Sequence, residues 1–576
     1  MTISFQELKR RSKETWKALR GSRRPTILVG TAACGRAVGA SEVLEAFRRE
    51  LDSRGLEGAL IEVGCTGLCY AEPLVSIVKP SRPGVCYGNV TPEKARELVE
   101  RCLVRDDPLP RDALGTIGEG RVDGIPRLVE TAVFKPQVRR TLRNCGFIDP
   151  VRIGDYVANE GYSGLARALE IGPEQIIDQI KRSGLRGRGG AGFPTWRKWQ
   201  LCREAQGAPK YVICNGSEGD PGTFSNKLLL ESDPHSVLEG MLIAAYAVGA
   251  GRGYVYCPAE YALALQRLET ALAQMEECGF LGDRILGSSF GFRITIKEGA
   301  GAYICGEETA LVECIEGRRG VPRLRPPFPP TSGLWGLPTV INNVETLACA
   351  ALIAQRGAEW FAELGTDKSK GTKLFCLSGN VKHGGVIEVP FGMTLREIVQ
   401  AIGGGTSDGR PIKAVHTGGP GGGCLPPSLL DTPVDQDSLA VLGSSIGSGG
   451  VVVIDEDACI VDLARNSLDF AQREACGQCV PCRLGTRQMF DVLTDISRGR
   501  GRPDDLELLA ELAEGVKLGS LCGLGQTAPN TLLSTIRYFP DDYQAHIERK
   551  QCPTAACTLT ADEEPDPSLS LLGRGE

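Results

Sequence analysis

The sequence predicts a multidomain α/β protein that ends in an all-helical domain. The chain has 576 residues, which is more than one hydrophobic core normally organises. Helix-like and strand-like segments alternate up to about residue 450, and only helical patterns follow. We therefore divide the chain into an N-terminal arm (1–25), a small α/β domain (26–105), a Pro/Gly-rich linker (106–130), a large α/β domain (131–365), a smaller module (366–452), a helical domain (453–557) and a disordered tail (558–576).

Composition restricts the possible functions. No stretch approaches the roughly 18–20 apolar residues of a membrane helix, and the N-terminus has no apolar signal region. A net charge of -6 argues against nucleic acid as the main partner. We expect no direct membrane span and a cytoplasmic location. For such a chain, 22 cysteines indicate reduced thiols, some of them metal ligands.

Each domain shows its own pattern of elements. In residues 26–105, strands at TILVG, ALIEVGC and PLVSIVKP alternate with helices at SEVLEAFRRELDSRG and TPEKARELVERCL. In the large domain, the helix PEQIIDQIKRSGL precedes the strands APKYVICNG, GYVYCP and FRITIKEG. One short helix among several strands makes residues 366–452 a β-grasp-like module. Helical patterns such as CIVDLARNSLDFAQREAC dominate residues 455–550.

The strongest local signal is a group of four cysteines. The run CGQCVPCR places Cys476, Cys479 and Cys482 with two residues between neighbours, and Cys522 follows in SLCGLG. Three closely spaced thiolates and one remote thiolate converge readily on a cubane. A zinc site normally pairs two separate CxxC turns. The pattern therefore favours a 4Fe–4S cluster over zinc.

A glycine-rich run predicts a ligand loop. SGLRGRGGAGFPTWRKW contains GxGxxG at Gly187, Gly189 and Gly192, but a helix precedes it, whereas a dinucleotide turn follows a strand. Bare glycines let the backbone approach a phosphate or a flat ring, and Lys198 can meet phosphate. By itself, the run fits a flexible surface loop equally well.

Three further runs favour a nucleotide or flavin site. Carboxylates can accept hydrogen bonds from ribose hydroxyls, amides can bind the edges of a flavin, and aromatic rings can stack on adenine or nicotinamide. The candidate groups are Asn215, Ser217, Glu218 and Asp220 in CNGSEGDPGTF, Tyr303, Glu307 and Glu308 in GAGAYICGEETAL, Asn342, Asn343 and Thr346 in GLPTVINNVET, and the rings of Phe193 and Phe328.

Together, the motifs RGRGGAGFPT, GAGAYICGEETAL, PRLRPPFPP, INNVET and CGQCVPCR carry a family resemblance. They resemble the NADH-binding FMN flavoprotein subunit of respiratory complex I and the diaphorase subunits of NAD-linked hydrogenases, including electron-bifurcating ones, and of formate dehydrogenases. The resemblance covers roughly residues 140–545. It implies a Rossmann-like but distinct FMN- and NADH-binding domain, a β-grasp (soluble-ligand-binding) module and a helical bundle that holds the 4Fe–4S cluster.

The resemblance also implies roles for individual residues. Hydride passes from NADH to FMN by positioning alone, so no side chain is expected to act as a catalytic acid or base. NADH is expected near Phe193, Glu308 and Phe328. FMN contacts are expected from Gly187, Gly189, Gly190, Lys198, Asn215, Tyr303, Gly306, Glu307, Asn342, Asn343 and Thr346, and from Ser217 and Asp220 where flavin and nicotinamide meet.

Two of these positions depart from the family. Ser217 stands where the family usually has aspartate, and Asp220 where it usually has glutamate. The neutral or shorter side chains can alter nucleotide affinity or flavin potential, so the direction of electron flow stays open.

The N-terminal domain resembles a thioredoxin-like ferredoxin domain fused to this family. Its 2Fe–2S cluster normally uses four cysteines, but here Cys65 and Cys69 in GCTGLC are joined only by Cys34 in GTAACG. Gly30 or a neighbour stands where the fourth is expected, and Cys86 can replace it only if its strand lies close. We expect the cluster to be lost and the domain to act in docking.

A second metal site is suggested near the C-terminus. His546, Cys552 and Cys557 form H-x5-C-x4-C, and Cys459 begins a helix expected to pack nearby. Four such N and S ligands suit a closed tetrahedral zinc site. Thiols at a frayed terminus are an equally good interpretation.

The sequence leaves two functional hypotheses. In the first, the chain is an NADH-oxidising or NAD-reducing subunit, an NADH:acceptor diaphorase, that passes single electrons from FMN to the cluster and onward to iron–sulfur and catalytic partner subunits. In the second, it is an electron-transfer or assembly scaffold that has lost nucleotide turnover. Retention of the glycine loop, the two glutamates and the asparagine pair favours the enzyme.

Overall fold

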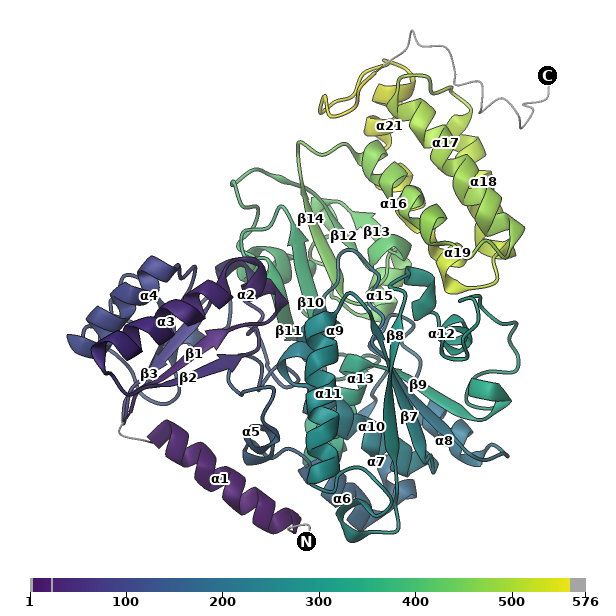
Figure 1. Ribbon diagram of the computed structural model, residues 1–576. Coiled ribbons are helices and arrows are strands. Elements are labelled where there is room, and N and C mark those ends of the chain that lie inside the picture. Colours follow the sequence, from purple (N-terminus) through teal and green to yellow (C-terminus); the bar gives the residue numbers. More distant parts are fainter. Residues whose placement is uncertain (1–3, 22–23, 560–576) are drawn as a thin grey trace.

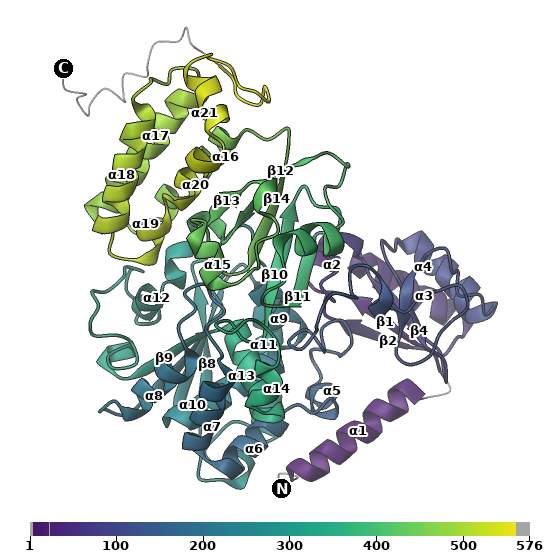
Figure 2. The ribbon, with the colours of Figure 1, turned by 180° about the vertical axis from the view of Figure 1, so that it is seen from behind.

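The computed structural model describes residues 4–21 and 24–559. It shows three sheets and a C-terminal group of helices, so the multidomain α/β class is confirmed (Figure 1). The N-terminal sheet and the C-terminal helices lie at different ends of a central α/β body, and the view from behind shows the same arrangement (Figure 2). Within the described residues, no helix is long and apolar enough to cross a membrane.

The N-terminal arm forms one helix, α1 (Phe5–Gly21), that packs against α5 (Ile153–Ala158) of the central body. Phe5 meets Phe280 edge to face, with ring centroids 5.9 Å apart. Lys9 and Lys13 both form ion pairs with Glu160, at 2.5 and 2.6 Å. Two of the basic residues of α1 are therefore used in contacts within the chain.

The N-terminal domain is a five-stranded mixed sheet in the order β2-β1-β3-β4-β5. One face packs under α3, through residues such as Val29 and Phe47, because the apolar positions of that helix share one side. Thr91 caps α4 by accepting a hydrogen bond from the amide of Lys94. The elements are β1 (Thr26–Gly30), α2 (Ala33–Ala37), α3 (Ala40–Arg54), β2 (Ala59–Val63), β3 (Val75–Val78), β4 (Gly84–Tyr87), α4 (Pro92–Leu98) and β5 (Ala113–Ile117).

The prediction of a linker over residues 106–130 is wrong in its middle part. Strand β5 lies inside it and pairs antiparallel with β4, and Ile117 is buried. Proline and glycine on both sides of this strand of five residues give the segment the composition of a loop.

The central sheet has four parallel strands in the order β8-β7-β6-β9. Its register places Asn215 of β6 beside Asn343 of β9, so both end at the carboxyl edge where open parallel sheets bind ligands. The strands are β6 (Tyr211–Asn215), β7 (Arg252–Pro258), β8 (Arg293–Gly299) and β9 (Thr339–Asn343). The helices are α6 (Ser163–Ile171), α7 (Pro173–Ser183), α8 (Thr195–Glu204), α9 (Ser225–Ser232), α10 (Pro234–Val248), α11 (Ala262–Glu277), α12 (Glu308–Ile315), α13 (Val344–Arg356) and α14 (Ala358–Ala362).

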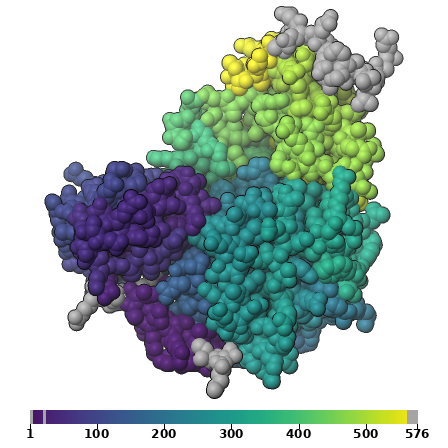
Figure 3. All heavy atoms as spheres, viewed as in Figure 1, coloured from purple at the N-terminus to yellow at the C-terminus, as the bar shows by residue number. Residues whose placement is uncertain are grey.

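The third sheet, in the order β11-β10-β14-β12-β13, mixes parallel and antiparallel pairs. The face of the N-terminal sheet that does not contact α3 packs against this third sheet. Leu28 and Val63 of the N-terminal sheet share one hydrophobic core with Phe375 and Val389 of the third sheet. The N-terminal domain is therefore packed onto the rest of the chain and not tethered beside it, as the space-filling view shows (Figure 3). The elements are β10 (Thr372–Gly379), β11 (Gly385–Pro390), β12 (Ile412–Thr417), β13 (Gly423–Leu425), α15 (Gln436–Val441) and β14 (Gly450–Asp455).

The C-terminal domain is helical, and α16 and α17 pack side by side. Its core contains Leu468, Met489 and Leu509, each from a different helix. From residue 560 onward, the tail expected for 558–576 lies outside the described residues. The helices are α16 (Ile460–Glu474), α17 (Thr486–Ser497), α18 (Asp505–Gly519), α19 (Gly523–Thr527), α20 (Asn530–Tyr538) and α21 (Pro540–Ile547).

Candidate functional site

The glycine-rich run forms a loop between α7 and α8, so the prediction that a helix precedes it is confirmed. The amide of Gly187 donates to the carbonyl of Phe193 at 2.9 Å, which folds the run back on itself. The amide of Arg188 donates to Thr346 Oγ1 at 2.8 Å and holds the loop against the first turn of α13. The loop is thus fixed at the carboxyl edge of the central sheet.

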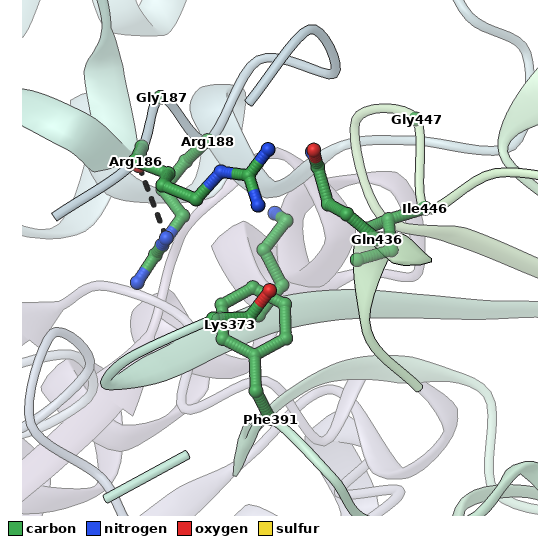
Figure 4. Close-up of a pocket in the computed structure, with 9 residues that line it drawn as sticks. Arg186, Gly187, Arg188, Lys373, Phe391, Gln436, Ile446 and Gly447 are labelled. Atoms are coloured by element: carbon green, nitrogen blue, oxygen red, sulfur yellow. Dashed lines mark hydrogen bonds between the residues drawn. The ribbon is translucent and has the colours of Figure 1, made fainter. Parts of the chain in front are cut away.

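A buried charge network lies beside the loop, and Figure 4 shows two of its members, Arg188 and Lys373. Lys373 Nζ lies 2.5 Å from Glu345 Oε2, and all of Arg188, Lys373 and Glu345 are buried. The Arg188 guanidinium stacks on Phe391 and donates to the carbonyl of Lys370 at 2.7 Å. Sequence reasoning missed this network, because Lys373 and Phe391 come from β10 and the end of β11, far from the loop in sequence.

The asparagines expected to bind a cofactor also hold the edge together. Asn215 Nδ2 donates to the carbonyl of Gly306 at 2.8 Å. Trp199 Nε1 donates to Asn342 Oδ1 at 2.8 Å. Asn343 Oδ1 caps α13 by accepting hydrogen bonds from the amides of Glu345 and Thr346, at 2.9 and 3.4 Å.

Lys198 and the paired glutamates meet in one cluster. Lys198 Nζ lies 3.0 Å from Glu308 Oε2, and it also donates to the carbonyl of Ile341. Glu307 caps α12 by accepting from the amides of Thr309 and Ala310. Arg325, from PRLRPPFPP, lies 3.6 Å from Glu307 and 3.5 Å from Glu308. Lys198, expected to bind FMN, thus pairs with Glu308, which is expected near the nicotinamide. Arg325 is a further cation in this cluster that the sequence did not predict.

The other expected residues differ in exposure and packing. Phe193 and Phe328 are 43% and 53% exposed, so both aromatic residues are accessible to a ligand. Gly306 faces Ser217, whose Oγ lies 3.3 Å from where a side chain at Gly306 would begin. Gly190 adopts a φ of 117°, which favours glycine, and its carbonyl accepts from Gln436 Nε2.

Both departures from the family pattern lie at this edge. The Asp220 carboxylate is buried and accepts a hydrogen bond from the amide of Gly222 at 3.0 Å. Burial raises the pKa of Asp220 to about 6. The amide of Ser217 donates to Asn215 Oδ1 at 3.1 Å. Glu218 is bonded to the amides of Asn226 and Lys227 and organises the start of α9.

The four cysteines of the predicted cluster lie near one another around the turn Pro481–Gly485, which packs against α17, α18 and α19. Cys476 and Cys479 lie in the loop after α16, Cys482 lies in the helical turn Pro481–Gly485, and Cys522 directly precedes α19. Helix α19 approaches so closely that a side chain on Gly525 would begin 3.1 Å from the Cβ of Cys482. Two guanidiniums support the loop, because Arg319 donates to the carbonyl of Cys476 and Arg483 to that of Gly477, each at 2.7 Å.

A short helical turn, Tyr303–Gly306, joins the sheet edge to these cysteines. The amide of Tyr303 donates to Glu474 Oε2 at 2.7 Å, and the Tyr303 ring meets Phe470 edge to face. Both partners lie on α16, which leads into the cysteine run. Ile304 of the same turn shares a core with Cys522.

The histidine and cysteines near the C-terminus also come together. Cys459, His546, Cys552 and Cys557 offer ligand atoms that all lie within 4.8 Å of one another. Cys459 Sγ lies 3.6 Å from His546 Nε2 and 3.5 Å from Cys557 Sγ. His546 Nδ1 lies 2.7 Å from the carbonyl oxygen of Asp542. This contact orients the imidazole ring so that Nε2 faces the thiols.

The three cysteines of the N-terminal domain form another group. The Cys34, Cys65 and Cys69 thiols lie within 4.8 Å of one another. Cys86, on β4, is buried and stands outside that group. The strand therefore does not supply a fourth thiol there.

Comparison with known families agrees with this geometry. Residues 180–351 match the Nuo51 FMN-binding domain, and residues 462–546 match the NADH-ubiquinone oxidoreductase-F iron–sulfur binding region. Residues 374–424 match the SLBB domain. These ranges contain the glycine loop with the sheet edge, the four converging cysteines, and most of the third sheet.

Several known proteins are similar over most of the chain. The NADP-reducing hydrogenase subunit HndC of Solidesulfovibrio fructosivorans is 50% identical over 77% of this chain and 90% of its own length. A subunit of the NADH-quinone oxidoreductase of Rhizobium meliloti is 48% identical over 73% of this chain and all of its own length. The crystal structure of an NAD+-reducing [NiFe]-hydrogenase in the H2-reduced state matches 94% of this chain and 90% of that chain, with 29% identity and a TM-score of 0.64. The chain belongs to the family of NADH-quinone oxidoreductase subunits that carry the Nuo51 FMN-binding domain together with the iron–sulfur binding region.

Proposed function

We propose that the chain is the NADH-oxidising, or NAD-reducing, flavoprotein subunit of a larger redox complex. One observation carries the proposal. In the turn Tyr303–Gly306, the carbonyl of Gly306 accepts a hydrogen bond from Asn215 at the edge of the central sheet. The amide of Tyr303 donates to Glu474 of α16, the helix that leads into the cysteine run. A single rigid turn therefore lies between the candidate flavin site and the candidate cluster.

The glycine loop suits a flat phosphorylated cofactor such as FMN. A side chain at Gly187 would begin 3.6 Å from the Phe193 carbonyl oxygen, an ordinary contact distance, so the protein itself does not require glycine at this position. Asn215 and Asn343 lie side by side at the sheet edge, where amides can bind a heterocycle. The residues that would hold FMN are Gly187, Gly189, Gly190, Lys198, Asn215, Ser217, Asp220, Tyr303, Gly306, Glu307, Asn342, Asn343 and Thr346.

The nicotinamide dinucleotide is proposed to bind beside the same loop. When bound, FMN supplies the hydride and single-electron chemistry that side chains lack. Phe193 and Phe328 would stack on the dinucleotide, and Glu308, held by Lys198, would accept its hydroxyls. The contribution of the chain is orientation and exclusion of water, not proton transfer.

The four converging cysteines are proposed to hold the 4Fe–4S cluster. Cys476, Cys479, Cys482 and Cys522 provide four thiolates from one loop, one helical turn and one helix start, a ligand set typical of a cubane. Finer fold assignments belong to the same proposal. They are a thioredoxin-like N-terminal domain, a Rossmann-like central domain, a β-grasp third sheet and a helical cluster domain.

A structural zinc ion is proposed for the second C-terminal group. Cys459, His546, Cys552 and Cys557 supply three sulfurs and one imidazole nitrogen, a common donor set for structural zinc. These residues link the start of α16 to the segment after α21. The ion would therefore fasten the end of the helical domain to its beginning.

The partners are proposed from the relatives. The names of those proteins describe subunits of an NADP-reducing hydrogenase and of NADH-quinone oxidoreductases. We propose that this chain likewise works with iron–sulfur and catalytic subunits that exchange electrons with its cluster. The second candidate, a scaffold without nucleotide turnover, is favoured by the buried Asp220, the neutral Ser217 and the N-terminal group of three cysteines instead of four.

Anaerobic titration of the purified chain with NADH tests the proposal. We expect flavin absorbance to bleach and a reduced 4Fe–4S signal to appear in low-temperature EPR. A Cys479→Ser variant should keep the flavin bleaching and lose the cluster signal. A chain that binds iron but contains no flavin, or flavin that NADH does not bleach, would leave the scaffold as the correct function.

A further inference from the structure

The three thiols of the N-terminal domain are spaced for one metal ion. Thiolates that bind one zinc ion at about 2.3 Å in a tetrahedron lie about 3.8 Å from one another. Cys65 Sγ and Cys69 Sγ lie 3.8 Å apart, and Cys34 Sγ is within 4.8 Å of both. A 2Fe–2S cluster takes four thiolates, two on each iron, and only three are gathered here. These residues therefore do not fit a 2Fe–2S cluster.

A buried carboxylate occupies the space of the missing thiol. Gly30 is one of the positions at which the fourth cysteine is expected, and a side chain there would begin 2.9 Å from Glu72 Oε2. The other carboxylate oxygen, Oε1, lies 3.8 Å from Cys34 Sγ. Glu72 is only 5% exposed. Its Oε2 accepts a hydrogen bond from the amide of Leu74 at 2.8 Å, which holds the carboxylate in this position.

Backbone groups around the thiols are arranged as in metal–thiolate sites. The amide of Gly67 points at Cys65 Sγ, at 3.2 Å, and amides commonly donate to metal-bound thiolates. The two thiol loops are also held by α9 of the central body. The amide of Ala33 donates to Glu231 Oε2 at 2.8 Å, and the amide of Cys65 donates to Ser232 Oγ at 3.1 Å.

We propose that Cys34, Cys65, Cys69 and Glu72 bind a single structural zinc ion. Three sulfurs and one carboxylate oxygen make up the four-coordinate shell that structural zinc prefers, once the Glu72 carboxylate, which lies beside Cys34 and outside the group of three thiols, shifts toward the other two thiols. Because zinc carries no electrons, this domain does not relay them. The ion instead fixes the two thiol loops in the shape that docks against α9.

Metal analysis of the full-length chain, purified anaerobically, tests this site. We expect about four iron atoms, from one 4Fe–4S cluster, and about two zinc ions per chain. Cys65→Ser and Glu72→Ala should each reduce zinc to about one and leave iron unchanged. Cys102→Ser is the matched control, because this buried cysteine of the same domain lies outside the group, and it should keep both zinc ions.

Two further measurements separate this site from the C-terminal zinc group and from an iron cluster. Cys552→Ser should remove one zinc ion, and the remaining ion should be replaceable by cobalt, with the visible absorption of a tetrahedral thiolate complex. In wild-type protein, about six iron atoms together with a reduced 2Fe–2S EPR signal would overturn the proposal. It would also be overturned if Cys552→Ser removed all of the zinc.

Discussion

The Glu474 carboxylate accepts a 2.7 Å hydrogen bond from the backbone amide of Tyr303. This bond joins the turn beside the sheet edge to the last residue of α16, two positions before Cys476. The two candidate redox sites thus share one direct polar contact as well as the packing of Tyr303 on Phe470.

Loss of that contact should slow electron transfer between the sites. Glu474→Ala removes a charge-assisted hydrogen bond worth about 1.5–3 kcal/mol and loosens the turn against α16. We expect cluster reduction after NADH addition to slow several-fold, while flavin bleaching keeps its rate. Stopped-flow absorbance follows both steps. Glu474→Gln keeps an acceptor and should behave like wild type, as should Glu511→Gln on the exposed side of α18. Equal slowing of both steps in Glu474→Ala would contradict this role.

Substitution in the glycine loop should remove flavin without unfolding the protein. An alanine methyl at position 187 meets no protein atom closer than 3.6 Å, so it would clash only with a ligand bound against the loop. We expect Gly187→Ala to melt at the wild-type temperature and to contain less than about a tenth of the wild-type flavin. Gly251→Ala, whose methyl has open space, is the control. Full flavin content in Gly187→Ala would place FMN elsewhere.

Substitutions at Lys198 and Glu308, which form one ion pair, should affect different ligands. Lys198→Ala removes a cation beside the loop, and we expect FMN affinity to fall roughly ten- to a hundredfold, the range for one charged hydrogen bond. Glu308→Gln should retain FMN and raise the KM for NADH. Flavin fluorescence on dilution and steady-state kinetics measure the two effects. Arg197→Ala, at the exposed neighbouring position, should change neither. If Glu308→Gln lost flavin instead, Glu308 would belong to the FMN site.

Asp220 should make stability depend on pH. Its pKa is about 6 in the folded chain against an ordinary value of 3.8, so folded protein keeps a proton that unfolded protein releases. Stability therefore falls as pH rises between these two values, and the loss is complete above about pH 6. We expect Asp220→Asn to remove this loss and to stabilise the protein at neutral pH by up to about 3 kcal/mol.

Thermal denaturation of wild type and Asp220→Asn at about pH 5 and about pH 7.5 measures the difference. Asp283→Asn, at a highly exposed position, should leave the pH dependence unchanged. A lower melting temperature of Asp220→Asn at neutral pH would show that the ionised carboxylate has a stabilising partner.

Removal of the C-terminal zinc ligands should destabilise the helical domain. Cys552→Ala leaves three of the four donors, and structural zinc sites contribute directly to folding. We expect loss of one zinc ion per chain and an earlier thermal transition of the helical domain, followed by circular dichroism. Cys424→Ala removes another buried thiol of the same core and should keep the zinc. An unchanged zinc content in Cys552→Ala would assign that ion to other residues.

Candidate ligands that lie close together in the sequence could be predicted. Residues that reach a site only through tertiary packing could not. In CGQCVPCR and H-x5-C-x4-C the candidate ligands lie close together in the sequence, so each site needed only one distant residue, Cys522 or Cys459. Glu72, Arg325 and Glu474 become neighbours of these sites only through packing of separate elements.

Strands β5 and β9 were not predicted, because their burial is not evident in the local sequence pattern. β9 ends in two asparagines and has the composition of a ligand motif, although its register with β6 makes it an integral part of the sheet. β5 has only five residues between proline- and glycine-rich flanks. In both cases the pairing partner, and not local propensity, determines the strand.

Helix α9 lies between the carboxyl edge of the central sheet and the thiol loops of the N-terminal domain. Near one end, Asn226 accepts a hydrogen bond from Asn343 at the sheet edge, and at the other, Glu231 and Ser232 hold the loops that carry Cys34 and Cys65. About 9 Å of helix separates these contacts. A displacement of the N-terminal thiol loops would therefore be passed through one short helix to Asn343 at the carboxyl edge of the central sheet.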